Sequence, residues 1–278
     1  MKFQRLVFAL LGMITFICVL PLILILALLL YHSLPVLKLS FLLEYPREGL
    51  RAGGILPAIV GTLYLALGTA IVSLPLGVLT AIYINEYAPK GRLTRVIRIA
   101  IVNLAGVPSV VYGLFGLAVF VMLFHFGVSL IAGIFTLSIL VLPIVITSAE
   151  EGLRSVPMSF REASLALGAT KWQTIRRVVL PTALPGIATG AILAVSRAAG
   201  ETAPILFTCA AFYLPRLPKS PFDEIMALPY HVYVIATQVP NAPLSIQYGA
   251  TVVLLGLVFL LNIVAILWRM RLRRTKKW

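Results

Sequence analysis

The chain has 278 residues, of which 60% are hydrophobic and only 12% are charged, and its net charge is +14. An ordinary soluble domain is about 45–50% apolar and roughly 25% charged, so this composition excludes a soluble enzyme, a disordered chain and a secreted disulfide scaffold. Because the basic residues stand in clusters between long charge-free segments, they indicate a membrane environment and not a nucleic-acid partner.

Six segments are long and apolar enough to cross a bilayer, since a spanning helix needs about 20 residues. The first has no small-residue cleavage site after its apolar run, which favours an uncleaved span over a signal peptide. The charge-free window at 99–149 holds two helices with a fold-back near Gly127, whereas three prolines leave room for one helix at 225–268. The predicted spans are 6–31, 57–84, 99–124, 128–148, 184–208 and 246–268.

The distribution of basic residues predicts the orientation of these spans. An even number of spans puts both termini on one side of the membrane, and cytoplasmic segments carry an excess of Lys and Arg. With the termini inside, 17 basic residues lie in inner segments and 5 in outer ones, and one lies within a span. We therefore expect a multi-pass protein with cytoplasmic termini, organised as a first helix and outer loop at 1–56, a core at 57–268 and a basic tail at 269–278.

The residue types that most often bind metals or carry out catalysis are isolated in this sequence. The two cysteines are too few for a disulfide framework, and the three histidines lack metal-ligand spacing, so we expect solvated histidines at the membrane interfaces. Neither a phosphate-binding loop nor a nucleophile motif is found, so we expect no catalysis and no metal or cofactor on this chain, with any ATP bound elsewhere. These residues are Cys18, Cys209, His32, His125 and His231.

The inner loop between the fourth and fifth predicted spans, at 150–183, is too long for a simple connection. It contains two capping boxes, in which a Ser or Thr and a Glu or Gln three residues later satisfy the free amides at the start of a helix. A glycine stands where the first helix would need a left-handed residue at its end. The residues are Ser159 with Glu162, Thr170 with Gln173, and Gly168.

These signals predict a helix at 160–167, a tight turn, and a second helix from residue 171 to Pro181. Three apolar residues of the second helix share one face because they are spaced by three and four positions. A helical pair of this kind is either a docking surface for another protein or an amphipathic loop on lipid headgroups, and composition favours neither. The three apolar residues are Trp172, Ile175 and Val179.

One basic residue, Arg197, lies within the fifth predicted span. It follows Pro185 by 12 residues, which places it about 18 Å along the helix, near the middle of a hydrocarbon core about 30 Å thick. Glu201 is one turn further on, so the two side chains can pair. Ionisable residues at such depth are costly and usually face a bundle interior or a water-filled path, although a pair that only locks the span to a neighbour has the same pattern.

The side-chain chemistry of the fifth predicted span also indicates what its residues contact. The planar donor fork of arginine suits an oxyanion with several acceptor oxygens, so Arg197 favours a path for a polar solute or an anion. Gly186 and Gly190 form a small-residue face that permits close approach of another helix.

The inner loop resembles the EAA loop of permease subunits of bacterial ATP-binding-cassette importers. The matching residues are Glu162, Ala163 and Ser164, then Gly168, then the stretch Val178 to Pro181, with Ser164 and Val178 departing from the usual Ala and Ile. The resemblance implies an all-α polytopic fold of the type I, MetI-like kind, with six spans. It also implies that the loop forms a coupling helix in a groove of an ATP-binding subunit, with Glu162, Ala163, Gly168, Leu180 and Pro181 as coupling residues.

Three further stretches resemble the A-type permease subunits of the phosphate-specific branch of these importers, namely Asn103 to Leu117, Ser196 to Thr208 and the outer loop Phe212 to Pro243. This resemblance implies phosphate import across a bacterial cytoplasmic (inner) membrane by alternating access, with Arg197 and Glu201 in the pathway. The implied partners are a homologous permease subunit in a heterodimer, two ATP-binding subunits that hold ATP and Mg, and an extracytoplasmic phosphate-binding protein.

Three alternatives stay open. A permease for another oxyanion, such as phosphonate, molybdate or sulfate, has the same sequence features. An ion-driven secondary transporter would use the ion pair as a relay, but it leaves the EAA loop without a role, and the sequence has no evident internal repeat. A membrane-embedded enzyme acting on lipids would need a cluster of His, Asp or Cys that the sequence lacks.

Overall fold

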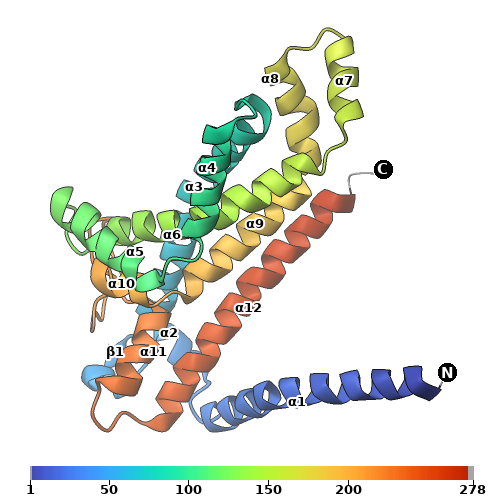
Figure 1. Ribbon diagram of the computed structural model, residues 1–278. Coiled ribbons are helices and arrows are strands. Elements are labelled where there is room, and N and C mark those ends of the chain that lie inside the picture. The colour runs from blue at the N-terminus through green and yellow to red at the C-terminus, as the bar shows by residue number, and fades with distance from the viewer. Residues whose placement is uncertain (1, 275–278) are drawn as a thin grey trace.

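Helices make up nearly all of the computed structural model, which describes residues 2–274 (Figure 1). Among the described residues, five helical segments are long and apolar enough to cross a membrane, and a sixth is obtained if a bent pair of helices counts as one span. The all-α polytopic fold predicted from the sequence is therefore confirmed. The long helices are α1 (Lys2–Ser33), α3 (Leu56–Ile82), α6 (Leu130–Arg154), α9 (Leu180–Gly200) and α12 (Leu244–Arg274).

Short elements connect these helices. Between α1 and α3 lie α2, a small antiparallel ribbon that pairs Pro46 with Gly53, and a 3-10 turn. Three π-helical segments widen the helices that they join. The short elements are α2 (Leu39–Leu43), β1 (Pro46–Arg47), β2 (Ala52–Gly53), α4 (Arg92–Leu104), α5 (Ser109–Gly116), α7 (Met158–Ala166), α8 (Lys171–Thr174), α10 (Ala203–Thr208), α11 (Leu228–Thr237), the 3-10 turn Glu48–Leu50 and the π-helical segments Tyr83–Tyr87, Leu117–Leu123 and Ile175–Val179.

The centre of the molecule is formed by α3, α6 and α9, which pack closely because small residues lie at their contacts. A Cβ atom added to Gly186 of α9 would lie 2.8 Å from Cα of Gly152 of α6, and one added to Gly190 would lie 2.5 Å from Cβ of Ser148. The small-residue face predicted on the fifth span is thus the contact between α9 and α6. These contacts also set the antiparallel register of the two helices.

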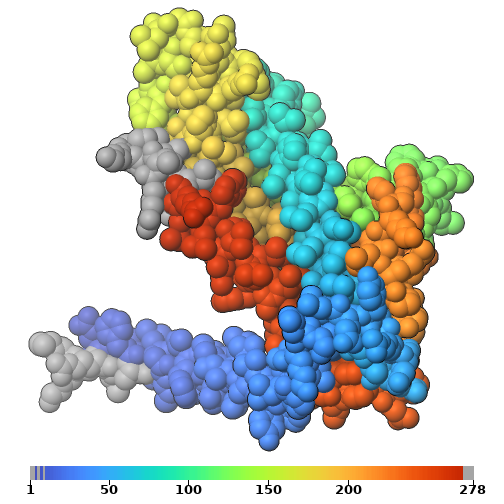
Figure 2. Space-filling model, turned by 180° about the vertical axis from the view of Figure 1, so that it is seen from behind, coloured from blue at the N-terminus to red at the C-terminus, as the bar shows by residue number. Residues whose placement is uncertain are grey.

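Helix α1 extends away from the rest of the chain (Figures 1 and 2). Over Leu10–Ser33 its most apolar window has none of its residues buried. Its contacts with the bundle are confined to its C-terminal end, where the rings of His32 and Tyr248 of α12 lie 5.1 Å apart. The apolar surface of α1 is therefore available to lipid or to another membrane protein.

The third predicted span, a single helix at 99–124, is wrong. Residues 92–104 form α4, and the chain then bends by 100° into α5 and the π-helical segment that follows it. Pro108 lies at the bend, where it provides no backbone amide and disfavours helical geometry in the residue before it. If this segment crosses the membrane, it does so as a broken span.

The fifth predicted span, at 184–208, is wrong at both ends. The helix begins at Lys171, passes through the π-helical segment Ile175–Val179 without ending at Pro181, and stops at Gly200. A π-helical turn shifts the hydrogen-bond partners ahead of a proline, so the helix can continue where an α-helix would be interrupted. Glu201 has an extended backbone, with φ −75° and ψ 133°, and α10 follows as a separate helix.

The remaining predicted spans agree with the structure to within a few residues at most ends, although α6 runs six residues beyond its predicted end. The predicted basic tail begins within α12, and its last four residues lie outside the described part of the chain.

Candidate functional site

The helices α7 and α8 project together beyond the ends of α6 and α9 (Figure 1). Gly168 lies in the turn between them with a φ of +81°, a left-handed backbone as predicted. The capping box of Thr170 and Gln173 is complete, with both hydrogen bonds present. The predicted capping box of Ser159 is wrong, because Pro157 is the N-cap of α7, the helix begins at Met158, and Ser159 lies inside it.

The residues predicted to contact an ATP-binding subunit divide between this projection and the helix bundle. Glu162, Ala163 and Gly168 are exposed, and Leu167 at the tip is 89% exposed. Within residues 2–274 the Glu162 side chain has no hydrogen-bond or ion-pair partner, so its carboxylate is free to meet another chain. Leu180 and Pro181 instead lie half-buried, within the helix that leads into the bundle.

The apolar face predicted on the second helix is only partly buried. Ile175 and Val179 are buried against the ends of α3 and α6, whereas Trp172 is exposed on the projection. Part of this apolar face therefore packs inside the chain, and the part at Trp172 is exposed.

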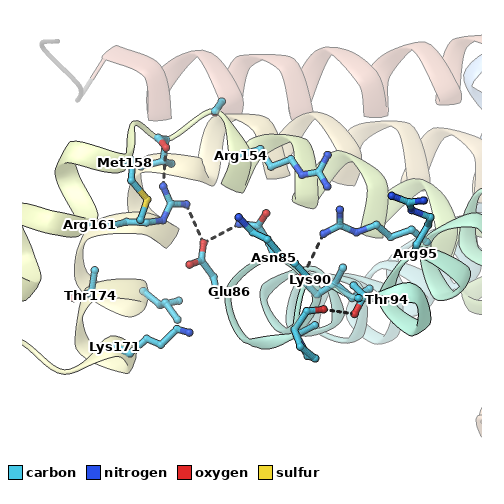
Figure 3. Close-up of a pocket in the computed structure, with 18 of the residues that line it drawn as sticks. Asn85, Glu86, Lys90, Thr94, Arg95, Arg154, Met158, Arg161, Lys171 and Thr174 are labelled. Carbon is cyan, nitrogen blue, oxygen red and sulfur yellow. Dashed lines mark hydrogen bonds and ion pairs between the residues drawn. The ribbon is translucent and has the colours of Figure 1, made fainter.

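Arg161 of α7 anchors the projection to the bundle, a role that the sequence did not predict. Its guanidinium forms an ion pair of 2.9 Å with Glu86 of the π-helical segment Tyr83–Tyr87 that continues α3, and the two side chains are only 12% and 10% exposed. The same group donates hydrogen bonds to the carbonyl oxygens of Val156 and Leu153, just beyond and at the end of α6. Asn85 donates a further hydrogen bond to Glu86 (Figure 3). One largely buried side chain thus holds α7, the segment that follows α3, and the end of α6 together.

A second ion-pair cluster lies beside this anchor. Glu150 of α6 lies 2.9 Å from Arg98 of α4 and 2.7 Å from Arg154 of its own helix. Lys171, the first residue of α8, lies over the ring of Tyr87 at 4.7 Å. The start of α4, the end of α3 and the projection are therefore joined at one end of the molecule.

The ion pair predicted in the fifth span is confirmed. Nε of Arg197 donates a hydrogen bond of 3.0 Å to Oε1 of Glu201, and the two side chains are 35% and 16% exposed. Because Gly186 lies opposite Gly152 and Gly190 opposite Ser148, the antiparallel register places Arg197 opposite about residue 141, roughly midway along α6. The pair is thus at mid-depth of the helix bundle, with α9 ending beside it.

Two sequence stretches that are far apart in the chain meet next to this ion pair. A Cβ on Gly113 of α5 would lie 2.8 Å from Cδ2 of Phe207 and 3.0 Å from Cα of Pro204, both of α10. Glycine at this position lets α5 approach the segment that follows Glu201. The stretches at 103–117 and 196–208, which resemble the phosphate-specific branch, therefore form one packed unit.

The outer segment between α10 and α12 is fixed to the region that follows α1. Arg51 donates a hydrogen bond of 3.0 Å to the carbonyl of Pro240, and the Tyr213 hydroxyl donates one of 3.2 Å to the carbonyl of Pro46. The amides of Lys219 and Ser220 hold the pKa of the Asp223 carboxyl below its usual range. These contacts give the outer segment a defined shape.

The prediction of three solvated histidines is wrong for His231 of α11, whose side chain is buried and 3% exposed. Neither of its ring nitrogens has a hydrogen-bond partner among the described residues, and burial lowers its pKa to about 4. The ring is therefore neutral at neutral pH. Over the described residues, no three His, Cys, Asp or Glu side chains are grouped in a way that could hold a metal ion.

An all-helical polytopic fold with a projecting helical pair and an ion pair at mid-depth has the architecture of a membrane transport permease. The family model described as binding-protein-dependent transport system inner membrane component matches residues 73–277. The chain belongs to this family, as its EAA loop indicates.

Individual relatives support this assignment. A probable ABC transporter permease protein, YqgI of Bacillus subtilis, is 37% identical over 227 residues, covering 77% of this chain and 76% of the relative. The phosphate transport system permease protein PstA 1 of Mycobacterium tuberculosis is 39% identical over 227 residues, covering 81% and 73%.

Solved structures share the fold at lower identity. A bacterial ABC transporter involved in the import of the acidic polysaccharide alginate matches with a TM-score of 0.65 at 20% identity, over 95% of this chain and 96% of that one. The MetNI methionine ABC transporter matches with a TM-score of 0.59 at 20% identity, over 79% and 94%. The predicted importer permease fold is confirmed by these similarities.

Proposed function

We propose that this chain is one permease subunit of an ATP-driven importer of inorganic phosphate. The observation that supports this most directly is the 39% identity to a permease named for phosphate transport, over 81% of the chain. The packed unit of residues 103–117 and 196–208 adds support, because the stretches that resemble phosphate permeases meet beside Arg197.

In this proposal Arg197 supplies a transient positive site for phosphate on the pathway. Its Nε is engaged by Glu201, which leaves the two Nη groups to donate hydrogen bonds to an oxyanion. The carboxylate of Glu201 orients the guanidinium and, by repulsion between like charges, weakens the binding of the anion. Weak binding is needed because a substrate that binds tightly at mid-depth would not leave.

The partners follow from the surfaces that this chain leaves open. A homologous permease completes the pathway, two ATP-binding subunits dock on the α7–α8 projections of the pair, and a phosphate-binding protein meets the outer segment. The α7–α8 end of the molecule and both termini face the cytoplasm, which agrees with the excess of basic residues in the inner segments. ATP and Mg are held by the ATP-binding subunits, whose closure switches the pathway by alternating access.

Substrate-dependent ATPase activity tests this function. The complete complex, with its two permeases, ATP-binding subunits and binding protein, is reconstituted in vesicles and supplied with phosphate, phosphonate, molybdate or sulfate. We expect that phosphate alone stimulates ATP hydrolysis and accumulates inside. Stimulation by a different oxyanion would assign the permease to that solute, and uptake driven by an ion gradient without ATP would favour a secondary transporter.

The proposed docking surface gives a first prediction. The change Glu162→Arg is expected to abolish co-purification of the permease with the ATP-binding subunit while leaving its thermal stability unchanged, because Glu162 has no partner within the described chain. Gly168→Val is also expected to reduce co-purification, but with a loss of stability, since φ is +81° and a branched side chain strains that backbone by about 1–3 kcal/mol. Co-purification and coupled uptake are the measurements.

Gly168→Asn is the matched control, because asparagine adopts left-handed geometry more readily than other non-glycine residues. A Cβ at this position would meet no atom within 4 Å, so only the backbone conformation separates the two variants. If Glu162→Arg and Gly168→Val both co-purified and supported full uptake, the docking surface would have to lie elsewhere.

A further inference from the structure

A cleft of about 1300 Å³ separates the start of α4 from the α7–α8 projection (Figure 3). Its lining is strongly basic, and four of its basic side chains already have partners within the chain. Arg98 and Arg154 pair with Glu150, Arg161 pairs with Glu86, and Lys171 lies over the Tyr87 ring.

Three further basic residues of the lining have no such partner. Lys90, Arg92 and Arg95 are exposed, and within residues 2–274 none of them forms an ion pair or hydrogen bond through its side chain. Glu86 is the one carboxylate in the lining, and Arg161 neutralises it. Glu150, beside the cleft, is shared by Arg98 and Arg154, and the Tyr87 ring under Lys171 is uncharged, so seven basic residues meet two carboxylates. The cleft therefore presents an uncompensated positive charge of five, which suits an anion.

Helix α4, which forms one wall of the cleft, has the properties of a helix at a membrane surface. At 100° per residue, Arg92, Arg95 and Arg98 lie on one side of α4, and exposed Leu93 and Ile97 lie on the other. Because the chain bends by 100° between α4 and α5, an α5 that enters the membrane leaves α4 along its surface. A helix with one basic and one apolar face in this orientation sits between headgroups and acyl chains.

The cleft also lies at headgroup depth. It is bounded by the π-helical segment that follows α3, in which Tyr83 and Tyr87 are exposed, and by Arg154 at the end of α6. Tyrosines gather at the boundary between the hydrocarbon core and water. The three free cations are thus placed where phospholipid phosphates are found.

We propose that this cleft binds the headgroup of an anionic phospholipid, with Lys90, Arg92 and Arg95 contacting its phosphate. An acidic segment of a soluble partner could meet the same cations, but it would leave the apolar face of α4 exposed to water, whereas a bilayer covers both faces of the helix. The inference rests on the proposed orientation of the α7–α8 end toward the cytoplasm, and it is independent of the transported solute. Since Arg161 lines the same cleft, the lipid would lie against the anchor of the projection.

Lipid binding to the complete complex tests the proposal. Complex purified in detergent is titrated with short-chain phosphatidylglycerol or phosphatidylcholine, and bound lipid is counted by native mass spectrometry. We expect selective binding of phosphatidylglycerol, and roughly a hundredfold weaker binding in the variant K90Q/R92Q/R95Q, since each basic residue near a membrane surface contributes about fivefold. The variant K90R/R92K/R95K keeps the charge and should bind like the wild type.

Other outcomes would overturn the proposal. Equal binding of both lipids, or unchanged binding in the Gln variant, would exclude a specific anion site. Displacement of the lipid by millimolar inorganic phosphate would assign the cleft to free phosphate, and binding to the permease pair but not to the full complex would assign it to the ATP-binding subunit. Labelling of wild-type complex with a photoactivatable phosphatidylglycerol, mapped to residues 90–95, keeps the test decisive if the Gln variant fails to assemble.

Discussion

Replacing Arg197 with Gln is expected to reduce phosphate uptake to below about one hundredth of the wild-type rate while basal ATPase activity and complex assembly persist. The glutamine keeps a hydrogen-bonding side chain but removes the charge that we propose binds the anion, and hydrogen bonds to charged groups contribute about 1.5–3 kcal/mol each. It also leaves Glu201, 16% exposed, without its cation, so the pathway acquires a net negative charge at mid-depth. Uptake of radiolabelled phosphate and ATP hydrolysis are measured on the same vesicles.

The variants that accompany this test separate a pathway role from a purely structural one. Arg197→Lys keeps the charge without the planar fork and should give intermediate uptake. The exchanged pair R197E/E201R keeps an ion pair at the end of α9 but moves the cation to the residue that follows the helix. If the exchanged pair transported phosphate at the wild-type rate, or Arg197→Gln did, the ion pair would serve only to lock α9 in place.

Removing Glu86 is expected to uncouple ATP hydrolysis from transport. Breaking a buried ion pair by deleting one partner costs about 3–5 kcal/mol, because the remaining charge is left uncompensated. In Glu86→Gln the guanidinium of Arg161, 12% exposed, keeps its two backbone acceptors but loses its carboxylate. The projection should then move independently of α3. We expect at least a tenfold fall in phosphate transported per ATP hydrolysed, measured on the reconstituted complex.

Glu151→Gln is the matched control, since Glu151 is exposed near the same end of the chain and has no side-chain partner within residues 2–274. The exchanged pair E86R/R161E should restore coupling only in part, because a glutamate at 161 cannot donate to the carbonyls of Val156 and Leu153. Identical coupling in Glu86→Gln and Glu151→Gln would show that the ion pair does not transmit movement.

The sequence predicts features that depend on neighbouring residues and misses those that depend on tertiary contact. The ion pair of Arg197 and Glu201 could be predicted from their spacing of four, at which helical side chains share a face. The pair forms although Glu201 lies just past the end of α9. The anchor of Arg161 could not, since its partner Glu86 is 75 residues away, and an acidic residue in a basic inner segment is its one local signal.

The errors in the predicted spans have a common physical origin. Hydropathy reports how much of a segment prefers lipid, but it contains no information on the direction of the helix axis. The bend at Pro108 and the stop at Gly200 both lie inside apolar stretches, so composition merges each with its neighbours. The two prolines affect their helices differently. Pro108 lies where the helix breaks, whereas Pro181 follows a π-helical turn that lets the helix continue.

The continuous helix from Lys171 to Gly200 connects the α7–α8 projection at one end with the ion pair at the other, so a rotation of this helix as a rigid body would move both. Its 30 residues span about 45 Å, and we take as the pivot the point where its backbone meets that of α6, at Gly186 against Gly152. The arms from this point to Lys171 and to Arg197 are about 22 Å and about 17 Å long. Rocking by about 10° would move Lys171 by about 4 Å and Arg197 by about 3 Å in the opposite direction. About three quarters of a displacement of the projection would therefore reach the ion pair, without movement of any other element.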